Sequence, residues 1–248
     1  MNYSKKENVF FDLGDSNNLV KQKAKQYVTP RNGGDRSIMS EVIDQDVYEF
    51  FTWTPKREPK FIVDIGAQIG SFSILSAMRF PKTTILGYEF NIKNYEHASI
   101  NCQNINNIHL FNKAVIGNKK PVGAFIHPTN PGGHKPIFEG SGCYISEDNF
   151  SKEKITYEYD IEVVNFLEII EKNNIDFIDF LKMDCEGSEY QIIKFMNENK
   201  LLRRIGHLAM ELHGHDKDNL INILKNNGFN VNVKNSMRLV YATNQNIT

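Results

Sequence analysis

Residues 63–70 read Val-Asp-Ile-Gly-Ala-Gln-Ile-Gly, and this stretch decides which fold we expect. It joins an apolar, β-rich run to a segment with helical spacing of apolar residues, and glycines bound the turn between them. Gly66 allows a sharp turn and the close approach of a ligand, while Gly70 allows the helix to pack closely on the strand. A nucleotide-like cofactor is therefore expected here. The expected contacts in this turn are Gly66, Ala67, Gln68 and Gly70.

Two carboxylates indicate which cofactor it is. Asp64 directly precedes the turn, and the glycines are spaced GxxxG, not the GxGxxG of pyrophosphate-binding loops. A carboxylate repels a pyrophosphate but stabilises a sulfonium and an amino group. Glu89, at the end of the next β-rich run, is placed to accept hydrogen bonds from a ribose. The pair favours S-adenosylmethionine over NAD, although Asp64 could instead only cap the following helix.

After residue 59, β-rich runs alternate with helical stretches, which is typical of βαβ units and a parallel sheet. The C-terminal runs FNVNV and RLVYAT are predicted to form an antiparallel hairpin. We therefore expect an α/β fold with a mostly parallel seven-stranded sheet and helices on both faces. The central strands are predicted at 61–65, 84–88, 108–111, 177–183 and 205–212, and the helices near 70–78, 92–102, 164–172, 188–196 and 217–226.

Two regions stand outside this alternation. Residues 1–57 are predicted to form a helical appendage packed on a domain of residues 58–248, because PKREP at 55–59 marks a break. Apolar residues from Ile38 to Phe51 recur at helical spacing, which predicts one amphipathic helix whose other face could border a cleft. Residues from about 117 to 154 are rich in Gly and Pro and are predicted to be an irregular insertion that recognises the substrate.

The composition excludes several classes of protein. A formal net charge of -1 supplies no field that would attract nucleic acid. No stretch approaches the length of a membrane span, and the N-terminal residues lack the apolar core of a secretory signal. We therefore expect a cytoplasmic protein without a nucleic-acid partner or a membrane span. The oligomeric state stays open.

Polar clusters follow two further predicted strands, DCEG at 184–187 and ELH at 211–213. Because ligands bind beyond the carboxyl ends of parallel strands, we expect both clusters around one cleft. A hydroxyl that accepts a methyl group needs a general base. His213 is the first candidate because an imidazole titrates near neutrality, and Asp184 is the second, with Glu186 as a like charge that raises its pKa.

Simpler roles for these side chains remain open. Asp184 and Glu186 could only cap the helix that begins near residue 188, and His213 could be a structural residue at a strand end. Asp184 and Glu186 could also be ligands of a magnesium ion, since oxygen donors suit it. Their spacing is not diagnostic, and we predict no metal.

Five motifs in this order resemble the FkbM family of methyltransferases. They are VDIGAQIGSFSILSA (63–77), GYEFN (87–91), NKAVIG (112–117), FIDFLKMDCEGSEYQIIKFM (177–196) and MELHGH (210–215). The chain departs from the family pattern at Gln68, where an Asn is more usual, and at Asn91, where a Pro is common. Residues 31–48 are loosely similar to the family's N-terminal motif.

The resemblance implies a class I methyltransferase fold of the Rossmann-like type, with S-adenosylmethionine as methyl donor. It also implies O-methylation of a hydroxyl on a sugar or secondary metabolite, as in the synthesis of a cell-surface polysaccharide. Phe90, Ala114 and Asp184, which lie in the matching motifs, are added to the expected cofactor contacts. The acceptor is thus expected to be a small molecule or a carbohydrate.

Three alternatives are set against this interpretation. A nucleic-acid base methyltransferase of the amino-methylating class would resemble families with a DPPY-like turn, where this chain has DCEG. An NAD-dependent oxidoreductase is disfavoured by the carboxylate before the turn. A partner subunit that binds S-adenosylmethionine without turnover is compatible with every motif above.

Overall fold

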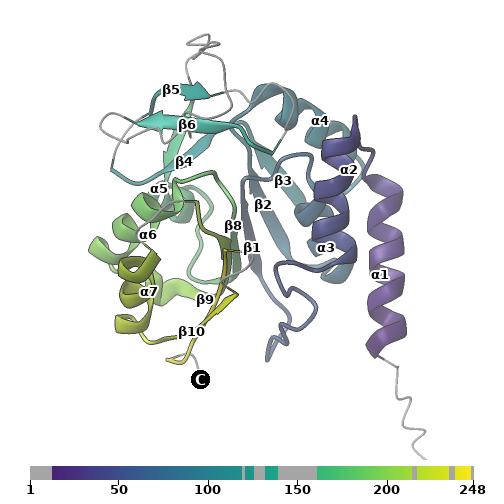
Figure 1. Cartoon of the computed structure of the whole chain (residues 1–248). Coiled ribbons are helices and arrows are strands. Elements are labelled where there is room, and N and C mark those ends of the chain that lie inside the picture. Colours follow the sequence, from purple (N-terminus) through teal and green to yellow (C-terminus); the bar gives the residue numbers. More distant parts are fainter. Residues whose placement is uncertain are drawn as a thin grey trace, which may run out of the picture.

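The computed structural model of the protein describes residues 13–118, 121–125, 132–138, 161–213, 217–234 and 238–246 (Figure 1). Its helical elements are α1 (Leu13–Tyr27), α2 (Gly33–Met39), the π-helix η1 (Ser40–Asp44), α3 (Ser71–Arg79), α4 (Ile92–Cys102), α5 (Phe166–Lys172), α6 (Glu189–Glu198), the 3-10 helix η2 (Leu202–Arg204) and α7 (Lys217–Asn226). Its strands are β1 (Phe61–Ile65), β2 (Thr84–Tyr88), β3 (Ile108–Phe111), β4 (Ala114–Ile116), β5 (Pro121–Phe125), β6 (Lys135–Phe138), β7 (Val163–Asn165), β8 (Ile178–Met183), β9 (Ile205–Glu211), β10 (Phe229–Lys234) and β11 (Leu239–Asn244).

A seven-stranded sheet of order β10-β11-β9-β8-β1-β2-β3 forms the centre of the molecule. The five strands from β9 to β3 are parallel, and β11 is antiparallel to both β9 and β10. The predicted fold class and its C-terminal antiparallel hairpin are therefore confirmed. Strand order reverses between β1 and β8, and the carboxyl ends at such a switch point are where ligands bind in open α/β sheets.

Helices cover both faces of this sheet because successive side chains of a strand point to opposite faces. On β1, Val63 and Ile65 pack with α5, α6 and α7 in one apolar cluster. Ile62 packs with residues of α1, η1, α3 and α4 in the other. In Figure 1 the two groups of helices lie on opposite sides of the strands, green to yellow on one side and purple to blue on the other.

The N-terminal region differs from the single predicted helix. Helical structure in this segment ends at Asp44, so the prediction is wrong from residue 45 onward. Asp46 and Glu49 both have φ of 52°, in the left-handed region, and the Asp46 carboxylate accepts hydrogen bonds from the backbone of Phe50 and Phe51. These bonds favour a turn over a continued helix. Helix α1 was not predicted, because it is largely polar apart from buried residues such as Ala24.

Two further differences lie after β3. The predicted helix over 164–172 begins only at Phe166, because Val163–Asn165 form β7, which pairs with β4. The Asn165 side chain then caps α5 by accepting a hydrogen bond from the Glu168 N–H at 3.0 Å. The predicted insertion holds the antiparallel pair of β5 and β6. Its other residues fall outside the described ranges, apart from 117, 118 and 132–134.

Within the described ranges, no helix is both long enough and apolar enough to cross a lipid bilayer.

Candidate active site

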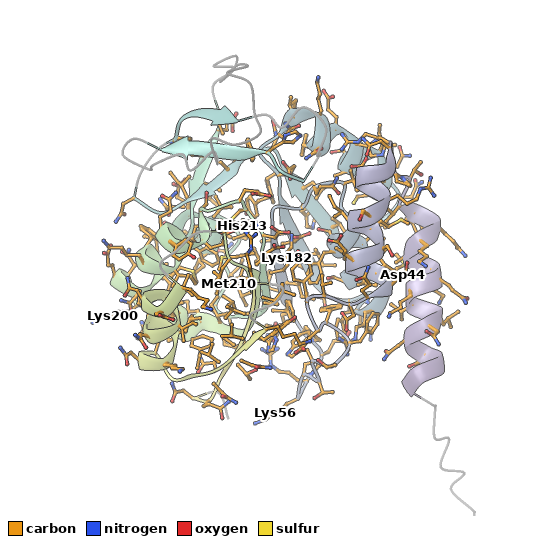
Figure 2. The ribbon with its side chains drawn as sticks, in the orientation of Figure 1. Asp44, Lys56, Lys182, Lys200, Met210 and His213 are labelled. Carbon is orange, nitrogen blue, oxygen red and sulfur yellow. The ribbon has the colours of Figure 1, made fainter. Side chains whose placement is uncertain are left out.

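A cavity of about 560 Å³ opens at the carboxyl ends of β1, β2, β8 and β9. Its walls come from the turn after β1, from the ends of β2 and β8, and from the N-terminal segment of α2, η1 and the residues that follow. The N-terminal segment therefore borders a cleft, as the sequence predicted. Figure 2 shows two residues of its lining, Lys182 and His213, near the middle of the molecule, whereas Asp44, Lys56 and Lys200 lie at the periphery.

The turn after β1, residues 66–70, is called the cofactor loop below. Gly66 has φ of 78°, and a Cβ atom there would lie 1.8 Å from the backbone oxygen of Asp184. Only glycine therefore lets the end of β1 approach the end of β8 this closely. Gly70 has φ of 86° and faces Ala98 and Cys102 of α4. It serves the packing of helices and does not line the cavity.

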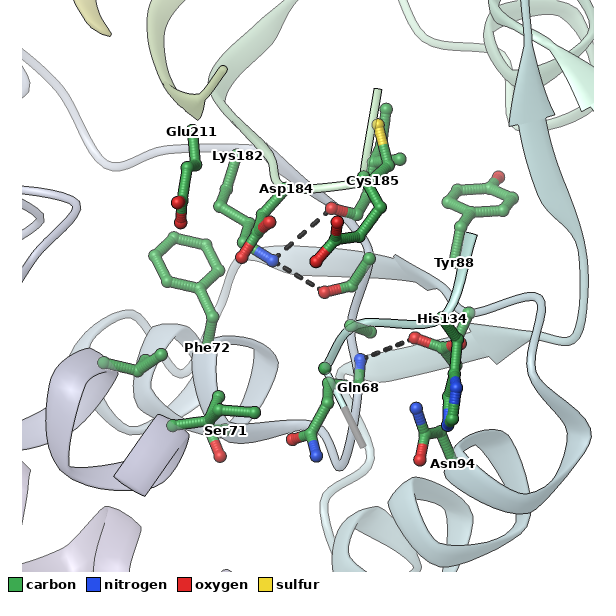
Figure 3. Close-up of a pocket in the computed structure, with 18 of the residues that line it drawn as sticks. Gln68, Ser71, Phe72, Tyr88, Asn94, His134, Lys182, Asp184, Cys185 and Glu211 are labelled. Atoms are coloured by element: carbon green, nitrogen blue, oxygen red, sulfur yellow. Dashed lines mark hydrogen bonds between the residues drawn. The ribbon is translucent and has the colours of Figure 1, made fainter. Parts of the chain in front are cut away.

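Glu89 lies at the end of β2 and lines the cavity. Its carboxylate accepts hydrogen bonds from the backbone N–H of Gln68 at 2.9 Å and of Asn91 at 2.8 Å. Burial raises the pKa of Glu89 to about 7, and the two N–H donors oppose that shift. The side chain is thus fixed beside the cofactor loop as a hydrogen-bond acceptor. Figure 3 shows Gln68 of this loop among the residues that line the cavity.

Asp64 lies beneath the cofactor loop and does not line the cavity. Its carboxylate accepts a hydrogen bond from Ser73 Oγ at 2.7 Å and forms an ion pair with Lys182 Nζ at 3.2 Å. Lys182 also donates to the backbone oxygen of Gly66 at 2.6 Å. Burial lowers the pKa of Lys182, but the charges of Asp64 and Asp184 outweigh this and keep its pKa above the ordinary value. The structure therefore gives Asp64 an ion-pair partner within the protein and places it outside the lining of the cavity.

His213 lines the cavity beside Asp184 and Glu211, which Figure 3 shows at the other end of the pocket from Gln68 and Asn94. Its Nδ1 is 3.1 Å from Oε1 of Glu189, which is fully buried. Its Nε2 is 3.6 Å from Glu211 and 3.9 Å from both Asp184 and Glu186. The predicted grouping of these side chains around one cleft is therefore what the structure shows.

The charge state of His213 changes the expected choice of base. Burial lowers its pKa, but the hydrogen bond and charge of Glu189, together with Glu186 and Asp184, raise the pKa to about 10. At neutral pH the imidazole is therefore protonated and cannot accept a proton. This reverses the order of the two candidates, so that Asp184 comes before His213.

Three residues that the sequence did not mark also belong to this site. Tyr48 is 4% exposed, and its hydroxyl donates to Asp184 Oδ2 at 2.7 Å. Lys182 and Glu189 hold the cofactor loop and His213 respectively. Only Lys182 could have been found from the sequence. A lysine within a buried strand indicates a functional or structural partner, because such a charge is costly to bury alone.

The oxygens of Asp184 and Glu211 and a ring nitrogen of His213 all lie within 4.8 Å of one another. Such a group can hold a divalent cation if the imidazole is neutral. A proton and a cation would compete for the same ring nitrogen of His213, and the absence of a metal stays a prediction.

The cavity gathers most of the residues that the sequence singled out. Of the expected cofactor contacts, Gly66, Ala67, Gln68, Glu89, Phe90, Ala114 and Asp184 line it, and Asp64 and Gly70 do not. The expected catalytic residues His213, Asp184 and Glu186 all line it.

Comparison with known proteins gives a match over most of the domain. Residues 64–231, more than half of the chain, match the family model described as "Methyltransferase FkbM domain". A curated protein, "Methyltransferase 1" of Beauveria bassiana (strain ARSEF 2860), is 21% identical over 168 residues, which are 64% of this chain and 68% of that protein.

Solved structures are similar at low identity. An FkbM methyltransferase from Methylobacillus flagellatus KT is 14% identical with a TM-score of 0.44, over 92% of this chain and 58% of that one. A precorrin-6y C5,15-methyltransferase from Geobacter metallireducens GS-15 is 12% identical with a TM-score of 0.42, over 97% of this chain and 90% of that one.

Proposed function

Because this chain belongs to the FkbM methyltransferase family, we propose that it transfers a methyl group from S-adenosylmethionine to a hydroxyl of a small molecule or carbohydrate. Its sheet has the topology of the class I, Rossmann-like methyltransferase fold. The observation that carries the proposal is a single cavity with a glycine-bounded loop and Glu89 at one end, and carboxylates around His213 at the other.

The residues at the first end fit S-adenosylmethionine. Glu89 is a buried acceptor held by two N–H groups, which suits the two hydroxyls of a ribose. Gly66 leaves no side chain between the loop and a ligand, and Phe90 and Ala114 supply apolar lining for an adenine ring. Asp64 would stabilise the positive charge of the cofactor only from a distance, because Lys182 already balances the charge of the carboxylate. When bound, the cofactor supplies an electrophilic methyl group on a sulfonium.

The residues at the second end suit an alcohol acceptor. Asp184 offers a carboxylate oxygen to the acceptor hydroxyl, accepts its proton as the new carbon–oxygen bond forms, and is oriented by Tyr48. His213, charged and fixed by Glu189, stabilises the carboxylates beside it before that proton arrives. Glu186 and Glu211 line the same space and can hydrogen-bond further hydroxyls of a sugar-like acceptor.

We extend the proposal to partners, location and organisation. A cavity end lined by Asp184, Glu186 and Glu211 disfavours a polyanionic strand with phosphates close to the reacting hydroxyl, so no nucleic acid is expected. A cytoplasmic location and the division into an appendage of residues 1–57 and a domain of residues 58–248 stay predictions.

Calorimetry with S-adenosylhomocysteine tests the cofactor assignment. Wild-type protein should bind it, and Glu89→Gln should weaken binding about tenfold because the amide has one acceptor oxygen where the carboxylate has two. Glu58→Gln, at an exposed position, serves as the matched control. No detectable binding by wild type, or stabilisation of the fold by NAD instead, would contradict the proposal.

Transfer from radiolabelled S-adenosylmethionine to a panel of cell-surface sugars and their nucleotide-linked precursors tests the reaction. Asp184→Asn should slow transfer about 10²-fold to 10⁴-fold while most of the binding of S-adenosylhomocysteine remains. Asp176→Asn, at an exposed position, is the control. Binding without transfer to any acceptor would favour the alternative of a partner subunit that has no turnover.

A further inference from the structure

A hydrogen-bond network joins the N-terminal segment to the cofactor loop. Its centre is Asp35 of α2, which is 0% exposed. The Asp35 carboxylate is held by Arg31, whose Nε and Nη2 donate at 2.7 and 3.0 Å. It also accepts a bond of 2.6 Å from the Gln68 side-chain amide. A buried carboxylate with this many partners is fixed in place, and so is whatever it holds.

Gln68 is the member of the cofactor loop that depends on this network. Its φ is 51°, in the left-handed region that a residue with a side chain adopts at a cost. Its side-chain oxygen accepts from the N–H of Ile69 at 2.8 Å, and its own N–H donates to Glu89 at 2.9 Å. The bond that the Gln68 side-chain amide donates to Asp35 completes the set of contacts that keep the backbone in this conformation. The orientation of Glu89 is therefore linked to Asp35 through one residue.

The same network continues to α4. Arg31 donates to Asn94 Oδ1 at 2.7 Å and to the backbone oxygen of Lys93 at 3.2 Å. Helix α4 begins at Ile92, three residues after Glu89, and Asn94 lines the cavity. Arg31 and Asp35 thus bridge the two elements that flank the expected ribose site.

The segment that carries Asp35 also forms the other wall of the cavity. Five of its residues line the cavity close to Asp35 in sequence, and they belong to α2 and η1. They are Gly34, Ser37, Ile38, Glu41 and Val42. Because helical neighbours move together, a fixed Asp35 fixes this wall relative to the cofactor loop.

We propose that Asp35 is a positioning residue that couples the cofactor loop, through Gln68, to the wall formed by α2 and η1. Occupation of the loop then orders the wall against which an acceptor binds, so that the cofactor prepares the acceptor side of the cavity. This inference rests on the proposed function, because it takes the loop to be the site of S-adenosylmethionine.

Gln68→Asn is the decisive variant. Asparagine tolerates the left-handed conformation, but its side chain is one methylene shorter and loses the reach to Asp35. Calorimetry should show about tenfold weaker binding of S-adenosylhomocysteine. Hydrogen exchange should show that saturating S-adenosylhomocysteine protects amides 37–45 in wild type and protects them much less in Gln68→Asn.

Asp35→Asn should reproduce both effects, since it removes the charge that holds Arg31 and Gln68. Two controls remove contacts of the same segment without touching the network. Tyr241→Phe removes a hydroxyl that donates to the Val47 backbone at 2.5 Å, and Asp44→Asn removes a surface ion pair with Lys25. Both should bind S-adenosylhomocysteine as wild type does and show the same protection of amides 37–45.

Equal binding or equal protection in Gln68→Asn and wild type would overturn the inference, and so would an effect of equal size in the controls. If Asp35→Asn does not fold, the two readouts on Gln68→Asn decide alone. Failure of wild type itself to bind S-adenosylhomocysteine is a different result, because it removes the proposed function and not only the coupling.

Discussion

Two charged clusters at the end of β8 differ in how their charges balance. Lys182 and Asp64 form a closed pair: both side chains are at most 4% exposed, and one positive charge meets one negative charge. His213, by contrast, faces Asp184, Glu186, Glu189 and Glu211, so negative charge is in excess. Both Lys182 and His213 line the cavity, so the difference lies in the balance of charge. The comparison separates a pair that fixes the cofactor loop from a cluster that has charge left for a ligand.

The largest effect is expected from breaking the closed pair. Lys182→Met keeps the length of the side chain but leaves Asp64 charged and buried, which should lower the free energy of unfolding by about 3–5 kcal/mol. Urea denaturation measures this change. Lys172→Met removes an exposed pair with Glu168 and should cost at most about 1 kcal/mol.

The double variant Asp64→Asn with Lys182→Met sharpens the result, because it removes both charges and should recover much of the lost stability. If Lys182→Met lowers the free energy of unfolding no more than Lys172→Met does, the pair of Lys182 and Asp64 does not constrain the cofactor loop in the way that the geometry indicates.

The second effect concerns how stability depends on pH. It comes from His213 and the four carboxylates around it, which we call the open cluster. The folded-state pKa of His213, about 10, lies above the ordinary value of 6.5. Its contribution to stability is therefore complete below about pH 6.5 and is lost as pH rises through about 10. Between pH 7 and pH 9, wild type should lose about 2 kcal/mol more than His213→Gln in urea denaturation. Parallel curves for the two proteins would mean that the carboxylates do not hold the imidazole in its charged form.

The smallest effect is expected from removing metal ions. We predict no metal at His213, where a proton would compete with a cation for the ring nitrogen, so dialysis against EDTA should leave methyl transfer and thermal stability unchanged. Loss of transfer that magnesium or zinc restores would show instead that Asp184, Glu211 and His213 hold an ion. That result would also make the open cluster a metal centre, with the ion as the missing positive charge.

Much of the fold could be predicted because its signals are local. The bounds of β1, β2, β3, α4 and α7 were predicted to the residue, since each is one apolar run or one periodic stretch between turn residues. The prediction of a helix up to Phe51 failed because a side chain competes with the helix for the backbone N–H groups. Asp46 turns the chain after η1 by bonding to the backbone of Phe50 and Phe51, although the apolar spacing continues to Phe51.

The sequence by itself determined several of the residues that line the cavity. Gly66, Gln68, Glu89, Asp184 and His213 each lie within three residues after the end of a parallel strand, and the carboxyl ends of such strands meet at one edge of the sheet. Their membership of a site could therefore be inferred without coordinates.

Only the tertiary structure decided what these residues do there, because charge and hydrogen bonding depend on partners that are distant in the chain. Tyr48 and Asp184 are bonded across 136 positions, and Gln68 and Asp35 across 33. Asp64 is neutralised by Lys182 from the neighbouring strand, and His213 is charged because carboxylates from separate elements converge on it. No spacing in the sequence reports such pairs, since the distance between two charges sets their interaction only after the chain has folded.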